Sequence, residues 1–171
     1  MIKNDKWITE FASGGGITPF NPEAVNPASY DISIGEQVVL YPSNDKTKRQ
    51  EWKLNNQGSL FLQPGEKALV VSLETIKTPN DIAVTVRLKS SLARQMIISP
   101  IGLFIDPGFE GRITLCLINL GVDRYELKEG RRIGQFIFNM MNAPAEIPYG
   151  DPRRTSHYQG SVDLTENKST L

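Results

Sequence analysis

Short stretches in which hydrophobic and polar residues alternate run through most of the chain. Alternation with a period of two places every second side chain on one face of a strand. Such stretches cover residues 30–35, 37–41, 59–62, 67–73, 82–87, 113–119 and 133–138. Gly, Pro, Asn or Asp residues separate them, and many short strands at fairly even spacing are typical of a β-sandwich, jelly roll or barrel.

Two segments depart from this pattern and predict helices. In residues 3–12, Trp7, Ile8 and Phe11 recur at helical spacing, and three glycines at positions 14–16 end the pattern. A second short helix is predicted over residues 91–96, beginning at the pair Ser90-Ser91. We therefore expect a mainly β protein with a short N-terminal helix and one internal helix.

The last thirty residues have a different character. From Asn142 onward the chain is polar, contains several prolines and shows little periodicity. Such a composition suits a mobile surface segment better than a buried core. The sequence thus predicts one β domain over residues 1–141, followed by a C-terminal arm or lid over residues 142–171.

Composition narrows the class of protein. The 171 residues carry a net charge of +0, with 22% charged and 39% hydrophobic residues, as in ordinary globular proteins. Nothing here indicates a nucleic-acid or membrane surface, and without an apolar run of membrane-spanning length or a signal peptide we expect a cytoplasmic protein. A single cysteine, Cys116, and a single histidine, His157, exclude an all-protein Cys/His zinc site and an intrachain disulfide.

Two motifs suggest the chemistry. Lys89-Ser90-Ser91-Leu92-Ala93-Arg94 supplies hydroxyls, backbone N–H groups and a guanidinium, all of which suit phosphate oxygens. Asp106, in the turn Asp106-Pro107-Gly108, can orient or deprotonate a water molecule. Together they indicate a polyphosphate and an activated water, although a serine N-cap and an ordinary turn remain the simpler interpretations of each motif alone.

The ordered set of motifs resembles the trimeric dCTP deaminase/dUTPase family of nucleotide hydrolases, and the deaminase branch more closely. The matching segments are 27–35, 62–66, 73–74, 90–94, 105–111, Asn119 and 130–135. The resemblance implies a distorted jelly roll or β-barrel of the dUTPase-like type that assembles as a homotrimer with active sites at subunit interfaces. It also implies a pyrimidine deoxynucleoside triphosphate as substrate, with Mg²⁺ bound mainly through the triphosphate.

The resemblance also implies roles for particular residues. The phosphate-binding set is Lys89, Ser90, Ser91, Arg94 and Gln135, the base- and sugar-binding set is Gly102, Leu103, Phe104 and Ile105, and the lid is His157, Tyr158 and Gln159. Lys89 stands where the family usually has Arg, so the charge is kept but the bidentate geometry is lost. His157 replaces a family Lys, and it either contacts phosphate when protonated or is a solvated surface residue.

One departure concerns catalysis. In the deaminases, a Glu ten residues after the turn Asp is the general acid/base, and here that position is Cys116. A thiol between leucines is a poor proton shuttle, and a buried inert thiol is the expected state. The favoured reaction is therefore hydrolysis of dUTP to dUMP and pyrophosphate, with Asp106 orienting the water, although a structural or sugar-contacting role for Asp106 stays open.

The sequence is also compatible with two other functions. One is a dCTP deaminase whose general base has moved, for which Glu110 is the nearest carboxylate in the motif. The other is a nucleotide-binding pseudoenzyme that acts as a sensor or regulator, because it would keep the binding site and lose a chemical residue.

Overall fold

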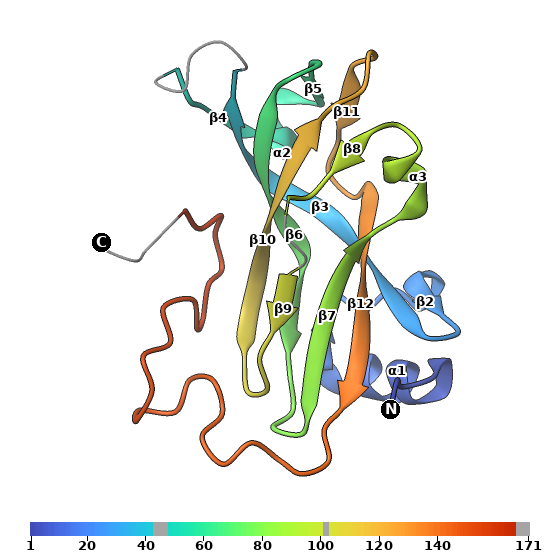
Figure 1. Ribbon diagram of the computed structural model, residues 1–171, viewed down its shortest axis with the longest axis vertical. Coiled ribbons are helices and arrows are strands. Elements are labelled where there is room, and N and C mark those ends of the chain that lie inside the picture. The colour runs from blue at the N-terminus through green and yellow to red at the C-terminus, as the bar shows by residue number, and fades with distance from the viewer. Residues whose placement is uncertain (43–47, 101–102, 167–171) are drawn as a thin grey trace.

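A curled antiparallel sheet forms the body of the protein in the computed structural model, which describes residues 1–42, 48–100 and 103–166 (Figure 1). Its principal strands are β3 (Ser29–Tyr41), β6 (Lys67–Lys77), β7 (Ile82–Leu88), β8 (Ile97–Ile98), β9 (Leu103–Ile105), β10 (Glu110–Asn119) and β12 (Arg132–Met140). They lie side by side in the order β8-β10-β6-β3-β12-β7-β9, so β9 forms one edge of the sheet.

Shorter elements complete the fold. Strands β1 (Ile17–Thr18), β2 (Val25–Asn26) and β4 (Gln50–Lys53) pair onto β6 and β3, while β5 (Leu60–Leu62) and β11 (Tyr125–Leu127) form a separate two-stranded sheet. The helices are α1 (Asp5–Phe11), which continues into a helical turn at Ala12–Gly16, a 3₁₀ turn at Pro22–Ala24, α2 (Leu54–Gln57) and α3 (Ser90–Ala93). The mainly β class and the short N-terminal helix are confirmed.

The two strands predicted over residues 30–35 and 37–41 are one long strand, β3. Its first half pairs with β12 and its second half pairs with β6, with a register shift between Ile34 and Val38. Gly35 lies in this shift, where a Cβ atom would come within 2.9 Å of the Ser72 carbonyl oxygen and would also collide with the Arg112 guanidinium. The irregularity bends β3, since a bulge increases the local twist, and it lets one strand serve both halves of the curled sheet.

The core is built from the inward face of the central strands and is closed at one end by α1. Tyr30, Phe136 and Phe138 are completely buried, and the rings of Trp7 and Phe11 lie 5.5 and 5.4 Å from the ring of Phe138. The apolar face predicted from the spacing of Trp7 and Phe11 is therefore the face that packs on the sheet. No helix in the described part of the chain is long and apolar enough to cross a membrane.

The internal helix is shorter than predicted. It spans Ser90–Ala93 rather than residues 91–96, because the chain turns at Met96, which has a positive φ of 57°, and enters β8 at Ile97. The Ser90-Ser91 pair does begin the helix. The prediction also missed β1, β2, β4, β8, β9 and β11, which have two to four residues each and are too short to show alternation.

A buried carboxyl group should make the stability of this fold depend on pH. Glu74 is 4% exposed, and although it accepts a hydrogen bond from Ser33 N at 2.9 Å, burial raises its pKa above the ordinary 4.5. Below the ordinary pKa of 4.5, Glu74 is protonated in both the folded and the unfolded state, and its contribution to the free energy of unfolding is fully present. That contribution is lost as the pH rises through the higher pKa of the folded state. Glu74→Gln, which cannot ionise, should therefore melt at a higher temperature than the parent at pH 8 and not at pH 4.

Thermal melts at both pH values measure this effect, and Glu36→Gln is a control of opposite sign. The pKa of Glu36 is lowered, first by its hydrogen bond to Arg112, so its contribution is present at neutral pH and lost on acidification. Removing that charge should lower the melting temperature at pH 8. Equal melting temperatures for the parent and Glu74→Gln at pH 8 would contradict the burial argument.

Candidate functional site

The predicted phosphate-binding motif forms a small exposed loop around α3. Lys89 precedes the helix in an extended conformation, and the side chains of Ser90, Ser91 and Arg94 are exposed. Arg94 Nη1 donates a hydrogen bond to Ser90 Oγ at 3.0 Å. The structure thus places a hydroxyl and a guanidinium together on the surface, as the sequence predicts.

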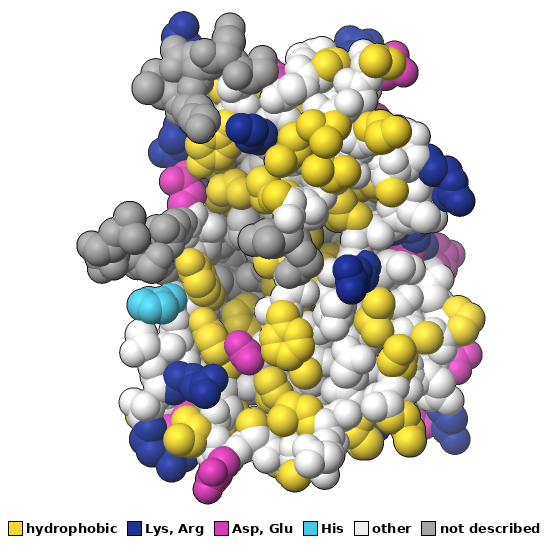
Figure 2. Space-filling model, viewed as in Figure 1, with side chains coloured by type: hydrophobic (Ala, Val, Ile, Leu, Met, Phe, Trp, Pro, Cys, Tyr) yellow, Lys and Arg dark blue, Asp and Glu magenta, His cyan; other side chains and the backbone are white. Residues whose placement is uncertain are grey.

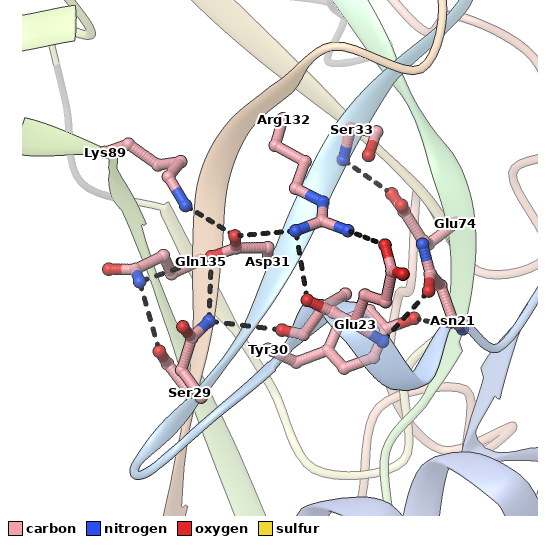
Figure 3. Close-up of polar contacts among 12 residues, drawn as sticks. Asn21, Glu23, Ser29, Tyr30, Asp31, Ser33, Glu74, Lys89, Arg132 and Gln135 are labelled. Atoms are coloured by element: carbon pink, nitrogen blue, oxygen red, sulfur yellow. Dashed lines mark hydrogen bonds and ion pairs between the residues drawn. The ribbon is translucent and has the colours of Figure 1, made fainter. Parts of the chain in front are cut away.

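A buried carboxylate that the sequence analysis did not identify lies beneath this loop. Asp31, on β3, is 3% exposed and receives a hydrogen bond of 2.5 Å from Lys89 Nζ (Figure 3). Gln135 on β12, paired directly with Asp31 in the sheet, donates from Nε2 to Asp31 Oδ1 at 3.4 Å. Asp31 therefore brings together two predicted phosphate-binding residues that are 46 positions apart in the sequence.

Three further side chains surround this carboxylate. Asn26 Nδ2 donates to Asp31 Oδ1 at 3.0 Å, Arg132 Nη1 lies 3.8 Å from Asp31 Oδ2, and Gln135 Nε2 also donates to Ser29 Oγ at 3.2 Å. We call these residues the Asp31 cluster: Asn26, Ser29, Asp31, Lys89, Arg132 and Gln135. Arg132 also lies 3.7 Å from Glu23 Oε2, so its charge is shared between two carboxylates, whereas Lys89 pairs with Asp31 alone among the described residues. The sequence signal was a charged residue between two apolar ones, Tyr30 and Ile32.

The turn that carries Asp106 lies immediately after β9. The Asp106 carbonyl oxygen accepts hydrogen bonds from Thr78 Oγ1 at 2.9 Å and from Phe109 N at 3.2 Å, which fix the turn. Its carboxylate is partly exposed and has no hydrogen bond or ion pair with any described residue. A fixed backbone with a free carboxylate is what a water-orienting residue requires.

Asp106 and α3 lie at opposite ends of β7 in one copy of the chain (Figure 1). Ile105 pairs with Val84, whereas Lys89 follows Leu88, the last residue of the same strand. Four residues of strand separate Val84 from Leu88, a distance of roughly 13 Å at about 3.3 Å per residue. One copy therefore does not bring the Asp106 carboxylate beside its own phosphate-binding loop.

The predicted base-binding segment is the edge strand β9. Ile105 is 5% exposed and its side chain belongs to the core, which leaves its main chain for the predicted contact with a base. Leu103 lines an apolar cavity of about 240 Å³ between β7, α3, β8 and β9, and Phe104 is 62% exposed. Among the described strands none pairs with the outer edge of β9, so its backbone groups there are free for main-chain contacts. Gly102 lies outside the described residues.

The face of the molecule around β9 is largely apolar. Figure 2 shows hydrophobic side chains exposed across this face, with few charged groups among them. Main-chain donors and acceptors beside apolar side chains suit a planar, uncharged ring such as a nucleobase.

The predicted lid contacts the Asp106 turn rather than α3. Gln159 Nε2 donates to the Gly108 carbonyl oxygen at 3.2 Å, and Gln159 Oε1 accepts from Glu110 N at 3.2 Å. Tyr158 N donates to the hydroxyl of Tyr149, and His157 is exposed. The arm (orange to red in Figure 1) thus rests on its own chain at the end of β7 far from the phosphate-binding loop.

Cys116 has the properties expected of an unreactive thiol. It is half-buried on β10, and burial raises the pKa of its thiol. The positive charge of Lys67 offsets part of that rise. Glu110, the carboxylate considered as a relocated base, forms an ion pair with Lys77 at 2.9 Å. Six residues of β10 separate Glu110 from Cys116, roughly 20 Å at about 3.3 Å per residue, so Glu110 does not replace an acid/base at this position.

A different carboxylate approaches this part of the sheet. Beyond Gln159 the arm crosses β10, where Thr165 N donates to Thr114 Oγ1 at 3.0 Å, and Glu166 forms an ion pair with Arg49 at 2.6 Å. Burial raises the pKa of Tyr41, and the nearby Glu166 and Cys116 contribute to that rise. Thr165, next to Glu166, thus meets β10 two residues before Cys116, an arrangement that sequence separation conceals.

Known proteins are similar to this chain in sequence and in fold. The family model for dCTP deaminase-like proteins matches residues 2–141. A protein of Bifidobacterium longum named "dCTP deaminase, dUMP-forming" is 38% identical, with 99% of this chain and 94% of that protein covered.

Two solved structures share the fold. The 2'-deoxycytidine 5'-triphosphate deaminase of Agrobacterium tumefaciens superposes with a TM-score of 0.70 at 19% identity, over 81% of this chain but only 47% of that one. The native dUTPase of EIAV gives a TM-score of 0.50 at 19% identity, over 80% of this chain and 92% of that one. The dUTPase-like fold expected from the sequence is thereby confirmed, and the chain belongs to the dCTP deaminase-like family.

Proposed function

We propose that the protein hydrolyses a pyrimidine deoxynucleoside triphosphate, and that dUTP to dUMP and pyrophosphate is the favoured reaction. The observation that carries this proposal is the contrast between two positions. Asp106 keeps a free, partly exposed carboxylate in a fixed turn, whereas Cys116 holds a thiol of raised pKa where the deaminases have their acid/base. The dUMP-forming relative of 38% identity supports the same product.

The residues divide into three roles. Lys89, Ser90, Ser91, Arg94 and Gln135 hold the phosphates through charged and neutral hydrogen bonds. Asp106 orients a water molecule toward the α-phosphorus, so that pyrophosphate leaves from the opposite side. The free edge of β9 contacts the base through main-chain groups, and the arm, with Gln159, holds the Asp106 turn in place.

We further propose that Mg²⁺ enters with the nucleotide. Mg²⁺ takes oxygen ligands and commonly uses substrate phosphates together with few protein groups. In the described part of the chain no three His, Cys, Asp or Glu side chains are grouped to hold a metal ion, and the triphosphate supplies the missing oxygens. When bound, the cation offsets the phosphate charge.

We also propose a homotrimer whose sites combine residues of two copies. The reason is the separation along β7: the Asp106 turn and the α3 loop of one copy are too far apart to hold the same α-phosphate and its attacking water. A second copy that presents its α3 loop to the Asp106 turn of the first completes the site.

The role of Asp106 has a direct test. Asp106→Asn should lower pyrophosphate release from dUTP by at least about 100-fold, because a positioned general base commonly contributes that much. Ion-exchange chromatography of the products with Mg²⁺ present measures the rate, and Asp123→Asn, an exposed carboxylate away from the site, is the control. A rate within threefold of the parent, with the melting temperature preserved, would refute catalysis by Asp106.

The shared site can be tested by mixing two inactive variants. Asp106→Asn and Arg94→Ala each damage one half of every site, but a mixed trimer contains some sites in which both halves are intact. After dissociation and reassembly of an equal mixture, random exchange should restore about one quarter of the parent activity. No recovery in mixed trimers verified by mass spectrometry would show that Asp106 and Arg94 act from the same copy.

Deamination of dCTP is the second candidate, favoured because Thr165, the residue before Glu166, bonds Thr114, two residues before Cys116 on β10. If Glu166 acts as the base, Glu166→Gln should abolish ammonia release from dCTP, while Glu110→Gln should leave it unchanged. An enzymatic ammonia assay with dCTP measures both variants. Ammonia release by Glu166→Gln at the parent rate would eliminate this carboxylate, and nucleotide binding without any product would identify a binding protein instead.

A further inference from the structure

We propose that Asp31 is a positioning residue for phosphate binding. Its buried carboxylate fixes the Lys89 ammonium at the start of α3, which turns a flexible lysine into a directed phosphate ligand. The proposal rests on the proposed function, since it concerns how the same site holds a triphosphate. It gives a role to Asp31, a residue outside the predicted phosphate-binding set.

The two side chains of the ion pair between Asp31 and Lys89 differ in exposure. The Asp31 side chain is 4% exposed and that of Lys89 is 29% exposed, with 2.5 Å between Oδ2 and Nζ (Figure 3). The carboxylate is therefore inside the protein and the ammonium lies at the boundary with solvent. An ammonium has three N–H donors, and Asp31 receives one of them, so two remain for a ligand on the exposed side.

A lysine needs more ordering than an arginine to bind phosphate. An ammonium on a four-carbon chain is a point charge with many rotamers, whereas an arginine presents a planar fork of donors that needs less ordering. Holding a free lysine in one place on a ligand costs conformational entropy. Asp31 holds Lys89 before the ligand arrives, so that cost falls on folding rather than on binding.

The Asp31 carboxylate contacts several elements of the fold besides Lys89. Asp31 also contacts Gln135 and Arg132 of β12 and Asn26 of β2, so it joins β3 to the α3 loop and to two neighbouring strands. Its negative charge repels phosphate, yet the carboxylate is buried and receives hydrogen bonds from Lys89, Gln135 and Asn26. Because the Lys89 ammonium neutralises that charge across the ion pair, we expect positioning to outweigh repulsion.

The test measures nucleotide binding without turnover. In the Asp106→Asn background, Asp31→Asn keeps the side-chain size and removes the charge that holds Lys89. We expect the Kd for Mg²⁺–dUTP in calorimetry to rise roughly tenfold, the loss typical of one charge-assisted hydrogen bond. The Kd for deoxyuridine, which has no phosphates, should stay within twofold. In the active enzyme, the KM for dUTP should rise with kcat nearly unchanged.

Matched variants separate positioning from a general loss of structure. Glu126→Gln removes a carboxylate that pairs with Arg131 at 3.5 Å, outside the Asp31 cluster, and should leave the Kd unchanged. Lys89→Arg added to Asp31→Asn should recover part of the affinity, because the guanidinium fork needs less support. Lys89→Gln alone should weaken dUTP binding about as much as Asp31→Asn, with little further loss in the double variant.

Several outcomes would contradict a positioning role for Asp31. Equal or tighter dUTP binding by Asp31→Asn would overturn the proposal, and tighter binding would show that Asp31 competes with the ligand for Lys89. If Asp31→Asn does not fold, Lys89→Gln with an unchanged Kd overturns it equally. A parent protein that binds neither dUTP nor dCTP would instead reject the proposed function, so the two failures are distinguishable.

Discussion

The irregular course of β3 is the constraint on which the remaining structure depends. One strand of thirteen residues pairs with β12 through its first half and with β6 through its second, and the shift at Gly35 lets the sheet curl without a break. That curl encloses the aromatic core between the two halves. It also presents Asp31, which lies before the shift, beneath the α3 loop, so the geometry of the phosphate-binding region follows from the bend.

Placing the chemistry at the ends of β7 has a clear structural logic. Strands are rigid, so a group at each end is held at a fixed separation, whereas a loop carrying both would be mobile. The Asp106 turn is secured by Thr78 and Gln159, and the α3 loop by Asp31. Each half of the proposed site is thus held in place within one copy, and in the proposed trimer assembly would bring the two halves together.

The sequence predicted the periodic part of this fold and little of what lies between. Alternation located β6, β7, β10 and β12 because each is long enough to show a buried face. It failed for β9 and β11, which have three residues each and are held by their partners rather than by their own pattern. The internal helix was predicted too long, since the turn at Met96 depends on a hydrogen bond from Leu120, which no local pattern reveals.

In the candidate site, too, the sequence predicted what is contiguous in the chain and missed what folding brings together. Ser90, Ser91, Arg94 and Asp106 were identified from motifs because the residues of each motif are contiguous. Asp31, by contrast, acquires its importance from Lys89 and Gln135, which reach it only after the sheet has formed. The contact between the arm and the Asp106 turn could likewise not be predicted, since Gln159 lies 51 positions from Gly108, whose carbonyl oxygen it contacts across the fold.

The contact between the C-terminal arm and the Asp106 turn does not depend on protein concentration. Because Gln159 and the sheet it touches belong to one covalent chain, their association is unimolecular, and its equilibrium is governed by the length of the tether rather than by dilution. Assembly of the proposed trimer, in contrast, would respond to concentration. A dilute solution therefore retains the contact between Gln159 and the Asp106 turn whether or not copies associate.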